Sequence, residues 1–469
     1  MNNEEMHQKG VEIQKYFCKK SFLYFLNRGF YELNPGQDLQ CNWHLKLIAE
    51  HLNAVESGEI KRLIINMPPR HLKSITINVL WSAWILGHNP NSRIISASYS
   101  GKLSEKHNSD VRQILKSPWY QSIFPNTKVK AGQDTKSKIV TTQNGFRIAT
   151  SVGGTLTGEG GDIIIIDDPH TPLQAQSIKY RTKVIDWFDQ TLLTRLNNPK
   201  YGKIVLVMQR LHDQDLSGHL FSKKQWKLLS LPAISVDDEN IQFGNFHYFR
   251  AARTAICEKM LSLTELDKIK QDIGSQAFAA QYLQNPVKLT GAYIKHEWIQ
   301  DYNPESLRFQ AIYQSWDCAF KTGAANDYSV CVTIGISKGN IYLLDVLKVK
   351  LEFSDLKQAV YRQFAKHQPQ AVLIEDKASG QALIQDVSRK HAMPIIKIRP
   401  KLDKISRFMQ SVNLFEAGKI YLSQKSLWYA DFMEELMSFP NVLHDDQVDA
   451  LTQFLNWHQS RVVQSVREM

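Results

Sequence analysis

The sequence has few cysteines and no long apolar run, and each lack excludes a class of protein. Its five cysteines are scattered without a Cys-x-x-Cys pair, so the pattern indicates neither a disulfide framework nor a cysteine-based zinc site. No apolar stretch approaches the roughly twenty residues needed to span a bilayer, and the polar start lacks the pattern of a signal peptide. We therefore expect a cytosolic protein that is not secreted and has no membrane partner.

Acidic residues are outnumbered by basic ones. Lys and Arg total 57 against 46 Asp and Glu, which gives a net charge of +11 and a pI near 9.2. An excess of this sign favours a polyanionic partner, with nucleic acid as the first candidate. The 469 residues are enough for two or three domains, each with a core of its own.

The stretch that contains Lys73 has the order of a phosphate loop but lacks its glycines. A run of strand character ends at two prolines, and helical spacing resumes after Ser74. A helix N-terminus offers unpaired N–H groups, a lysine here reaches the β- and γ-phosphates, and a serine hydroxyl can bind magnesium. The usual pattern has glycines where this chain has Met67 and Leu72, so a plain strand–turn–helix junction stays an alternative. The candidate ATP-binding residues are Pro69, Arg70, His71, Leu72, Lys73, Ser74 and Thr76.

Two carboxylates follow the apolar run 163–166, about ninety residues downstream. Four consecutive isoleucines predict a buried parallel strand, and ligands of such sheets bind at the carboxyl ends of the strands. Asp167 is a candidate magnesium ligand, and Asp168 stands where a base could orient the attacking water, a role more often filled by glutamate. Gln209, after the apolar run 203–208, can sense the γ-phosphate. A structural acidic turn and a solvated loop are the alternatives.

Strand and helix signals alternate through the first half of the chain. Strand character at 93–98, 163–166 and 203–208, with helical stretches between, predicts a parallel doubly wound sheet of the α/β class. We expect a helical lead-in over 1–40, this ATPase domain over 41–236, a connection over 237–305 and a second domain over 306–469. Trp43, just ahead of the phosphate-loop strand, could stack on an adenine or pack in the core.

The final third has strands that end in acids. Asp317 ends the first of three strands expected to form an antiparallel meander, Glu375 ends a later strand, and Asp445, Asp446 and Asp449 lie at a helix start. Two strand-end carboxylates and an acidic helix start can converge on two hard cations roughly 4 Å apart, which activate water against a phosphodiester. Each acid could instead be a cap or an ion-pair partner. Which of the three helix-start acids completes the site is open, and Asp446 is favoured.

Taken in order, these motifs carry a resemblance to a known family. The chain resembles the large terminase subunit of a tailed bacteriophage or prophage over nearly its whole length. Met67 to Ser74 is similar to the family's variant phosphate loop, 167–169 to its acidic strand end, and 208–210 to its coupling motif. The segments 315–317, 374–380 and 444–450 resemble the three motifs of its ribonuclease-H-like nuclease, which has a mixed sheet.

The resemblance implies an ATP-driven motor that moves double-stranded DNA into a procapsid and cuts it. Lys73, Ser74, Asp167 and Asp168 would act on ATP with Mg²⁺, Arg70 would add charge near the γ-phosphate, and the nuclease would use two Mg²⁺ or Mn²⁺. The implied partners are DNA, a small terminase subunit, the portal protein and further copies in a ring, in the cytoplasm of the bacterial host. A helicase-like or restriction-type translocase and an inactive prophage relic are the alternatives.

A basic segment lies between the nuclease motifs. Its residues Lys401, Lys404 and Arg407 could contact DNA phosphates, which position a duplex without reading its sequence. A solvated helix face explains the same pattern.

Overall fold

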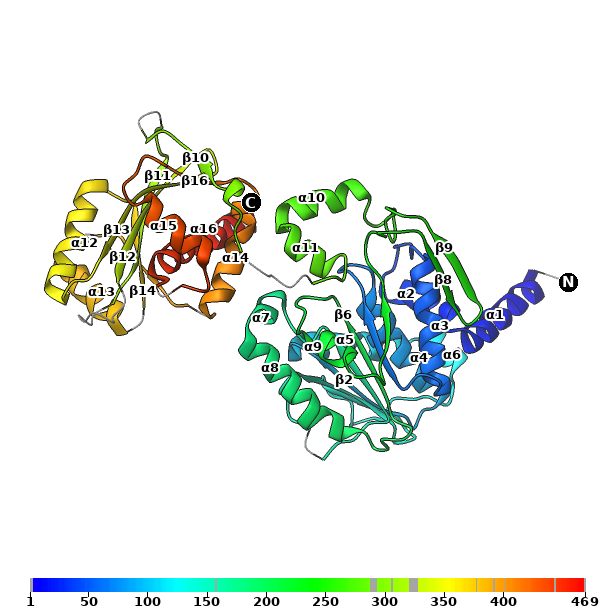
Figure 1. Cartoon of the computed structure of the whole chain (residues 1–469). Helices are drawn as coiled ribbons and strands as arrows, with labels where there is room; N and C mark the ends of the chain where they lie inside the picture. The colour runs from blue at the N-terminus through cyan, green and yellow to red at the C-terminus, as the bar shows by residue number, and fades with distance from the viewer. Residues whose placement is uncertain are drawn as a thin grey trace. The chain divides into compact units, whose positions relative to one another are not determined.

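The computed structural model describes residues 3–156, 158–286, 293–304, 307–319, 328–376, 378–390, 393–400, 402–442 and 444–467. The side chains of 3–9, 378–379, 388–390 and 462–467 are not part of that description. The chain divides into two compact units (Figure 1). Unit 1 contains Met1–Lys270 and Ser275–Val287, and unit 2 contains Gln271–Gly274 and Lys288–Met469.

Unit 1 is built on a seven-stranded sheet in which every neighbouring pair except the one at the β3 edge is parallel. The strand order is β3-β4-β2-β5-β6-β1-β7, so β6 lies between β1 and β5. Parallel register aligns the carboxyl ends of β1, β6 and β5 at one edge. The strands are β1 (Arg62–Asn66), β2 (Arg93–Ser98), β3 (Lys138–Val140), β4 (Phe146–Ser151), β5 (Ile163–Asp167), β6 (Lys203–Met208) and β7 (Lys227–Ser230).

Helices cover both faces of this sheet, because successive side chains of a strand point to opposite faces. On β5, Ile163 and Ile165 join the core beneath the first helices of the chain, whereas Ile164 and Ile166 join the core beneath the later ones. The first group is α2 (Phe22–Leu33), α3 (Trp43–Ser57), α4 (Trp81–His88), α5 (Gly101–Lys116) and α6 (Pro118–Ile123). The second group contains α8 (Ile178–Asp186) and α9 (Leu216–Phe221). The predicted doubly wound α/β sheet is confirmed.

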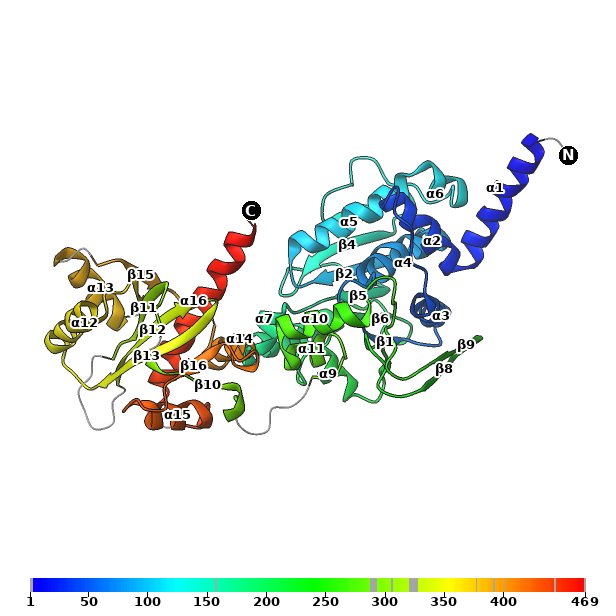
Figure 2. The same cartoon turned by 90° about the horizontal axis from the view of Figure 1, so that it is seen from above.

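The remaining elements of the first 286 residues extend or connect this body. Helix α1 (Asn3–Lys20) projects from unit 1 in both views (Figures 1 and 2). The others are α7 (Pro172–Gln176), the hairpin β8 (Glu239–Phe243) and β9 (Phe246–Arg250), α10 (Leu263–Ile273) and α11 (Ser275–Gln281). The hairpin contacts α3, where Trp43 is 4% exposed and stacks on Tyr248 with ring centroids 4.9 Å apart. This tryptophan packs in the core.

Unit 2 contains a seven-stranded mixed sheet in the order β10-β16-β13-β12-β11-β14-β15. The predicted antiparallel meander is present, since β12 pairs antiparallel with both β11 and β13. Strand β14 then pairs parallel with β11. The strands are β10 (Gln300–Asp301), β11 (Ala311–Asp317), β12 (Ser329–Ser337), β13 (Asn340–Val349), β14 (Ala371–Glu375), β15 (Ile395–Ile398) and β16 (Ile420–Leu422).

Both faces of the second sheet are also covered. On β12, Val330 and Val332 join one core and Cys331 joins the other. The first core lies under α14 (Lys404–Glu416), α15 (Tyr429–Ser438) and α16 (Asp446–Arg467), and the second lies under α12 (Phe353–His367) and α13 (Ala378–Lys390). Within the described ranges, none of the helices in either unit has the length and apolar character needed to cross a membrane.

Candidate nucleotide site and acidic centre

The loop after β1 adopts a phosphate-loop path without the usual glycines. Arg70 and Leu72 have φ angles of 67° and 64°, in the left-handed region that side chains other than glycine seldom adopt. Leu72 occupies the position at which the usual motif has glycine. Such backbone conformations cost of order 1–3 kcal/mol each and persist where the surrounding structure fixes them, most often at functional sites.

The loop brings Lys73 and Ser74 to the acidic end of β5. The Lys73 Nζ lies 2.9 Å from Asp168 Oδ2, and the Ser74 hydroxyl donates to Asp167 Oδ1 at 3.1 Å. Asp167 is fully buried, and burial raises the pKa of both carboxyls, while the charge of Lys73 acts to lower the two pKa values. The residues predicted from two distant motifs therefore meet at the carboxyl edge of the sheet.

Asp168 is held by its backbone as well as by its side chain. Its φ is 44°, its N–H donates to the Val207 carbonyl at 3.0 Å, and its carbonyl accepts from Tyr99 N–H at 3.1 Å. Its Oδ1 accepts from the N–H of Gln209 at 3.3 Å. The carboxylate is thus fixed in direction by the end of β6 and by the residue after β2.

The other predicted nucleotide contacts lie around this pair in different environments. Arg70 is exposed, while His71 is buried and its Nδ1 lies 2.8 Å from the Pro69 carbonyl oxygen. The Thr76 hydroxyl and the Gln209 side-chain oxygen are buried and have no hydrogen-bond partner among the described residues. The structure brings Gln209 beside Asp168 but encloses Thr76 within the protein.

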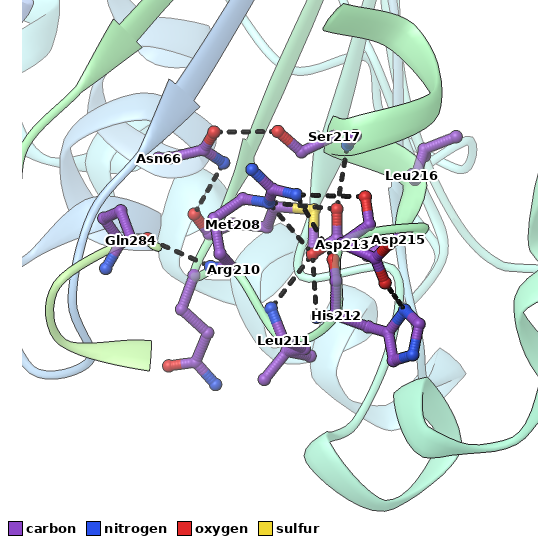
Figure 3. A network of polar contacts seen from close by, with 12 residues as sticks. Asn66, Met208, Arg210, Leu211, His212, Asp213, Asp215, Leu216, Ser217 and Gln284 are labelled. Carbon is purple, nitrogen blue, oxygen red and sulfur yellow. Dashed lines mark hydrogen bonds and ion pairs between the residues drawn. The ribbon is translucent and has the colours of Figure 1, made fainter. Parts of the chain in front are cut away.

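The segment after β6 forms a tightly bonded loop (Figure 3). The Arg210 guanidinium donates through Nε to both oxygens of the fully buried Asp215, which also accepts from the N–H groups of Leu211 and His212. Arg210 N–H donates to the side chain of Gln284, 3.0 Å away. The loop that follows Gln209 is therefore a rigid unit rather than a solvated connection.

A set of buried polar residues that the sequence motifs do not predict lies beside Asp167. Asn78 and Arg147 are both fully buried, and the Asn78 amide donates to Asp167 Oδ2 at 3.0 Å. The available signals are weak: an asparagine four residues after Ser74, and an arginine within the strand character of 146–151.

In unit 2, Asp317 and Glu375 end neighbouring parallel strands. Trp316 of β11 pairs with Ile374 of β14, so the two carboxylates emerge at the same edge of the sheet. Burial raises the pKa of Asp317 to about 8, and the charges of Asp449, Glu375 and Asp446 contribute to the rise. Three of the predicted acids therefore lie close enough to Asp317 for their charges to oppose its ionisation.

Glycine at position 380 allows the motif after β14 to fold tightly. A Cβ there would overlap the carbonyl oxygen of Glu375. The first turn of α13 can therefore pass directly over the end of β14 only with glycine at this position.

The helix start supplies acids with different surroundings. Asp446 and Asp449 are 4% and 5% exposed, and Asp446 Oδ2 accepts from the Tyr328 N–H at 3.2 Å. Asp445 is half-buried and pairs with Lys404 at 2.6 Å. The two buried acids share the first turn of α16.

Two cations of α14 lie among these acids. Lys404 pairs with Asp449 at 2.9 Å as well as with Asp445, and Arg407 pairs with Asp449 at 2.8 Å and lies 3.6 Å from Glu375. Arg407 is only 9% exposed, so it is not part of a solvated helix face, and Lys401 lies outside the described residues. In the part of unit 2 that the structure describes, no three His, Cys, Asp or Glu side chains form a ready-made metal cluster.

The chain resembles a known protein family in sequence and several solved structures in fold. Residues 314–457 match the family described as the terminase RNaseH-like domain. The whole chain is similar to the large terminase from a thermophilic bacteriophage in complex with ADP, with 11% identity, a TM-score of 0.52, and coverage of 91% of this chain and 98% of that chain. A second crystal form of the same phage protein gives 11% identity, a TM-score of 0.53, and 91% and 97% coverage. None of the curated proteins matches the chain.

Residues 314–457 of the C-terminal unit are thus similar to the terminase RNaseH-like domain, and the chain has the fold of phage large terminases. The resemblance predicted from the sequence is confirmed.

Proposed function

We propose that the chain is an ATP-driven motor that moves viral double-stranded DNA into a procapsid and cuts it. The observation that carries the ATPase half is the meeting of Lys73 with Asp168 and of Ser74 with Asp167. The large terminase of a thermophilic phage, which has a similar fold, has been solved in complex with ADP and with ATP-gamma-S. These complexes support the ATPase half of the proposal. The basic net charge of +11 suits a DNA partner.

In unit 1 the residues have separate tasks. Lys73 lies where its charge would stabilise the transferring phosphoryl group, and Arg70, exposed on the same loop, would add to it. Ser74 and Asp167 offer two hard oxygen ligands 3.1 Å apart, a donor set that fits Mg²⁺. Bound Mg²⁺ would neutralise charge on the β- and γ-phosphates. Asp168 would orient the water that attacks, and Gln209 would sense the γ-phosphate.

In unit 2 the acids at the ends of β11, β14 and the start of α16 would cleave DNA. Asp317, Glu375 and Asp446, with Asp449 or Asp445, would supply the oxygen ligands that Mg²⁺ or Mn²⁺ prefers. Two such ions would activate water and stabilise the leaving oxygen. Lys404 and Arg407 pair with these acids now, and we propose that they turn to the DNA phosphates when metal is bound.

The proposed assembly contains further partners. A small terminase subunit would select the viral DNA, the portal protein of the procapsid would receive it, and several copies of the chain would form a ring in the cytoplasm of the bacterial host.

The test measures the two activities of the full chain separately. ATP hydrolysis is followed by phosphate release with and without double-stranded DNA, and cleavage by conversion of supercoiled plasmid with Mg²⁺ or Mn²⁺. Lys73→Ala and Asp317→Ala should each remove one activity and keep the other. Lys102→Ala and Asp355→Ala replace exposed residues of the same types and should change neither.

The outcomes separate the candidate functions. DNA-stimulated hydrolysis together with metal-dependent cleavage supports the proposal. Hydrolysis that unwinds duplex DNA would favour a helicase-like translocase. Loss of both activities in a folded, DNA-binding chain would indicate an inactive prophage relic and refute the proposal.

A further inference from the structure

The side chain of Asn78 lies against the far oxygen of the Asp167 carboxylate. Asp167 Oδ1 accepts from the Ser74 hydroxyl at 3.1 Å, while Oδ2 accepts from Asn78 Nδ2 at 3.0 Å. The two oxygens of one carboxylate therefore have different surroundings. Asn78 is fully buried, so no water competes for its amide.

The amide of Asn78 can point only one way. Its Oδ1 accepts from Ser96 Oγ at 2.7 Å and from Arg147 Nη2 at 2.6 Å. A guanidinium only donates, so a flipped amide would place its NH₂ group against Arg147. The arginine thereby directs the Asn78 donor toward Asp167.

The second hydrogen of the same NH₂ group is also used. His107 Nδ1 lies 2.9 Å from Asn78 Nδ2, and because Nδ2 donates, this imidazole nitrogen accepts. A ring nitrogen that accepts a hydrogen bond carries no proton, so the imidazole is neutral in this arrangement. Its 3.5 Å approach to Asp167 is therefore not an ion pair, and the amide is the group that anchors Oδ2.

Arg147 is a fully buried cation in a cradle of neutral oxygens. Besides Asn78 Oδ1, it donates to Asn108 Oδ1 at 2.7 Å, to the Asn78 carbonyl at 3.3 Å and to Ser82 Oγ at 3.4 Å. Its positive charge acts on Asp167 across the Asn78 amide. A buried arginine is retained at such a site when it fixes the direction of other groups and offsets a buried negative charge.

The backbone explains why one helix can present both Ser74 and Asn78 to the same carboxylate. The segment Ser74–Leu80 is a π-helix, and the Trp81 N–H at its end donates to the Thr76 carbonyl five residues earlier. π-turns are frequent at functional sites. Residues four apart lie on one side of the helix, as they also would in an α-helix, and here both reach Asp167.

We propose that Asn78 is a positioning residue that reserves Asp167 Oδ1 for the Mg²⁺ of the bound nucleotide, and that Arg147 holds Asn78 in this orientation. The proposal rests on the ATPase activity proposed above. Neighbouring ligands of an octahedral Mg²⁺ at about 2.1 Å lie about 3 Å apart, which the 3.1 Å separation of Ser74 Oγ and Asp167 Oδ1 matches. Partners that orient metal ligands in this way typically change metal affinity by roughly 10–100-fold.

The experiment titrates the full chain with Mn²⁺ in the presence of ADP and follows free Mn²⁺ by electron paramagnetic resonance. Asn78→Ala and Arg147→Met should weaken Mn²⁺ binding by roughly 10-fold or more, while ADP binding in EDTA stays unchanged. Arg147→Lys keeps the charge and one donor and should recover part of the loss. Asn126→Ala replaces an exposed asparagine and should bind Mn²⁺ as the unsubstituted chain does.

A smaller change covers the case in which the first variants fail to fold. Ser96→Ala removes only one of the two donors to Asn78 Oδ1 and should weaken Mn²⁺ binding in the same direction, by less. Unchanged Mn²⁺ affinity in folded Asn78→Ala or in Ser96→Ala overturns the proposal and leaves the ATPase proposal standing. An unsubstituted chain that binds neither ADP nor Mn²⁺ with ADP overturns both.

Discussion

Replacing Asp168 with asparagine should leave ATP bound and stop its hydrolysis. The substitution keeps the shape of the side chain, and asparagine tolerates the left-handed φ of 44° at this position better than most residues. It removes the negative charge that lies 2.9 Å from Lys73 and replaces one of the two acceptor oxygens with an NH₂ donor, which cannot take a proton from the attacking water. Loss of such an acid–base group typically costs 10²–10⁴-fold in rate, or about 3–5 kcal/mol in the barrier.

Stability should fall less than the broken ion pair suggests. Removing one partner of a buried pair usually costs about 3–5 kcal/mol, because the other charge is left uncompensated. Lys73 also acts on the neighbouring Asp167, so one lysine and one carboxylate remain. We therefore expect a smaller loss in the free energy of unfolding, measured by chemical denaturation.

The assay pairs phosphate release at saturating ATP and Mg²⁺ with binding of a fluorescent ATP analogue. Asp162→Asn is the matched control, since Asp162 is an exposed carboxylate just before β5. The pKa of Asp168 is raised by burial, so the rate of the unsubstituted chain should rise with pH as this group ionises. Turnover of Asp168→Asn within a few-fold of the unsubstituted rate would remove Asp168 from the mechanism.

Three further predictions concern both units. Lys73→Ala should lower ATP hydrolysis by roughly 10²-fold or more and leave plasmid cleavage intact, as paired activity assays would show. The pKa of Asp317 is raised from 3.8 to about 8, so the metal-free chain should lose stability as pH rises between these values. Binding of a metal ion at pH 7 should then release about one proton. Calorimetry in several buffers measures this release, which should be absent in Asp317→Asn. Gly218→Ala should destabilise the chain by about 1–3 kcal/mol in thermal denaturation, because a Cβ there would overlap the Asp213 carbonyl oxygen; Gly10→Ala should not, since nothing lies within 4 Å.

The central strands of the first sheet at 93–98, 163–166 and 203–208 were predicted from the sequence. Four consecutive isoleucines before Asp167 suit a strand covered on both faces, and the structure sends alternate isoleucines into two cores. The meeting of Lys73 with Asp168 follows from strand order, because both lie at the carboxyl edge of a parallel sheet. The roles of these side chains stay predictions.

Contacts between distant segments were not accessible in the same way. Arg147 reaches Asn78 from β4, and no local pattern in the sequence joins the two. The π-helix that contains Asn78 departs from the 3.6-residue period on which helix prediction depends. Arg407 has the pattern of a surface cation, yet its neighbours Asp449 and Glu375 come from other elements.

The burial of Arg147 has a consequence for how the motor would respond to salt. Exposed charges are screened within about 8–10 Å at physiological ionic strength, whereas a cation sealed in the protein is screened far less. Arg147 is fully buried, so its effect on Asp167 should be nearly the same in dilute buffer and beside densely packed DNA with its counterions. Ionic strength should therefore change the proposed binding of the protein to DNA, and leave the chemistry of the proposed nucleotide site largely constant.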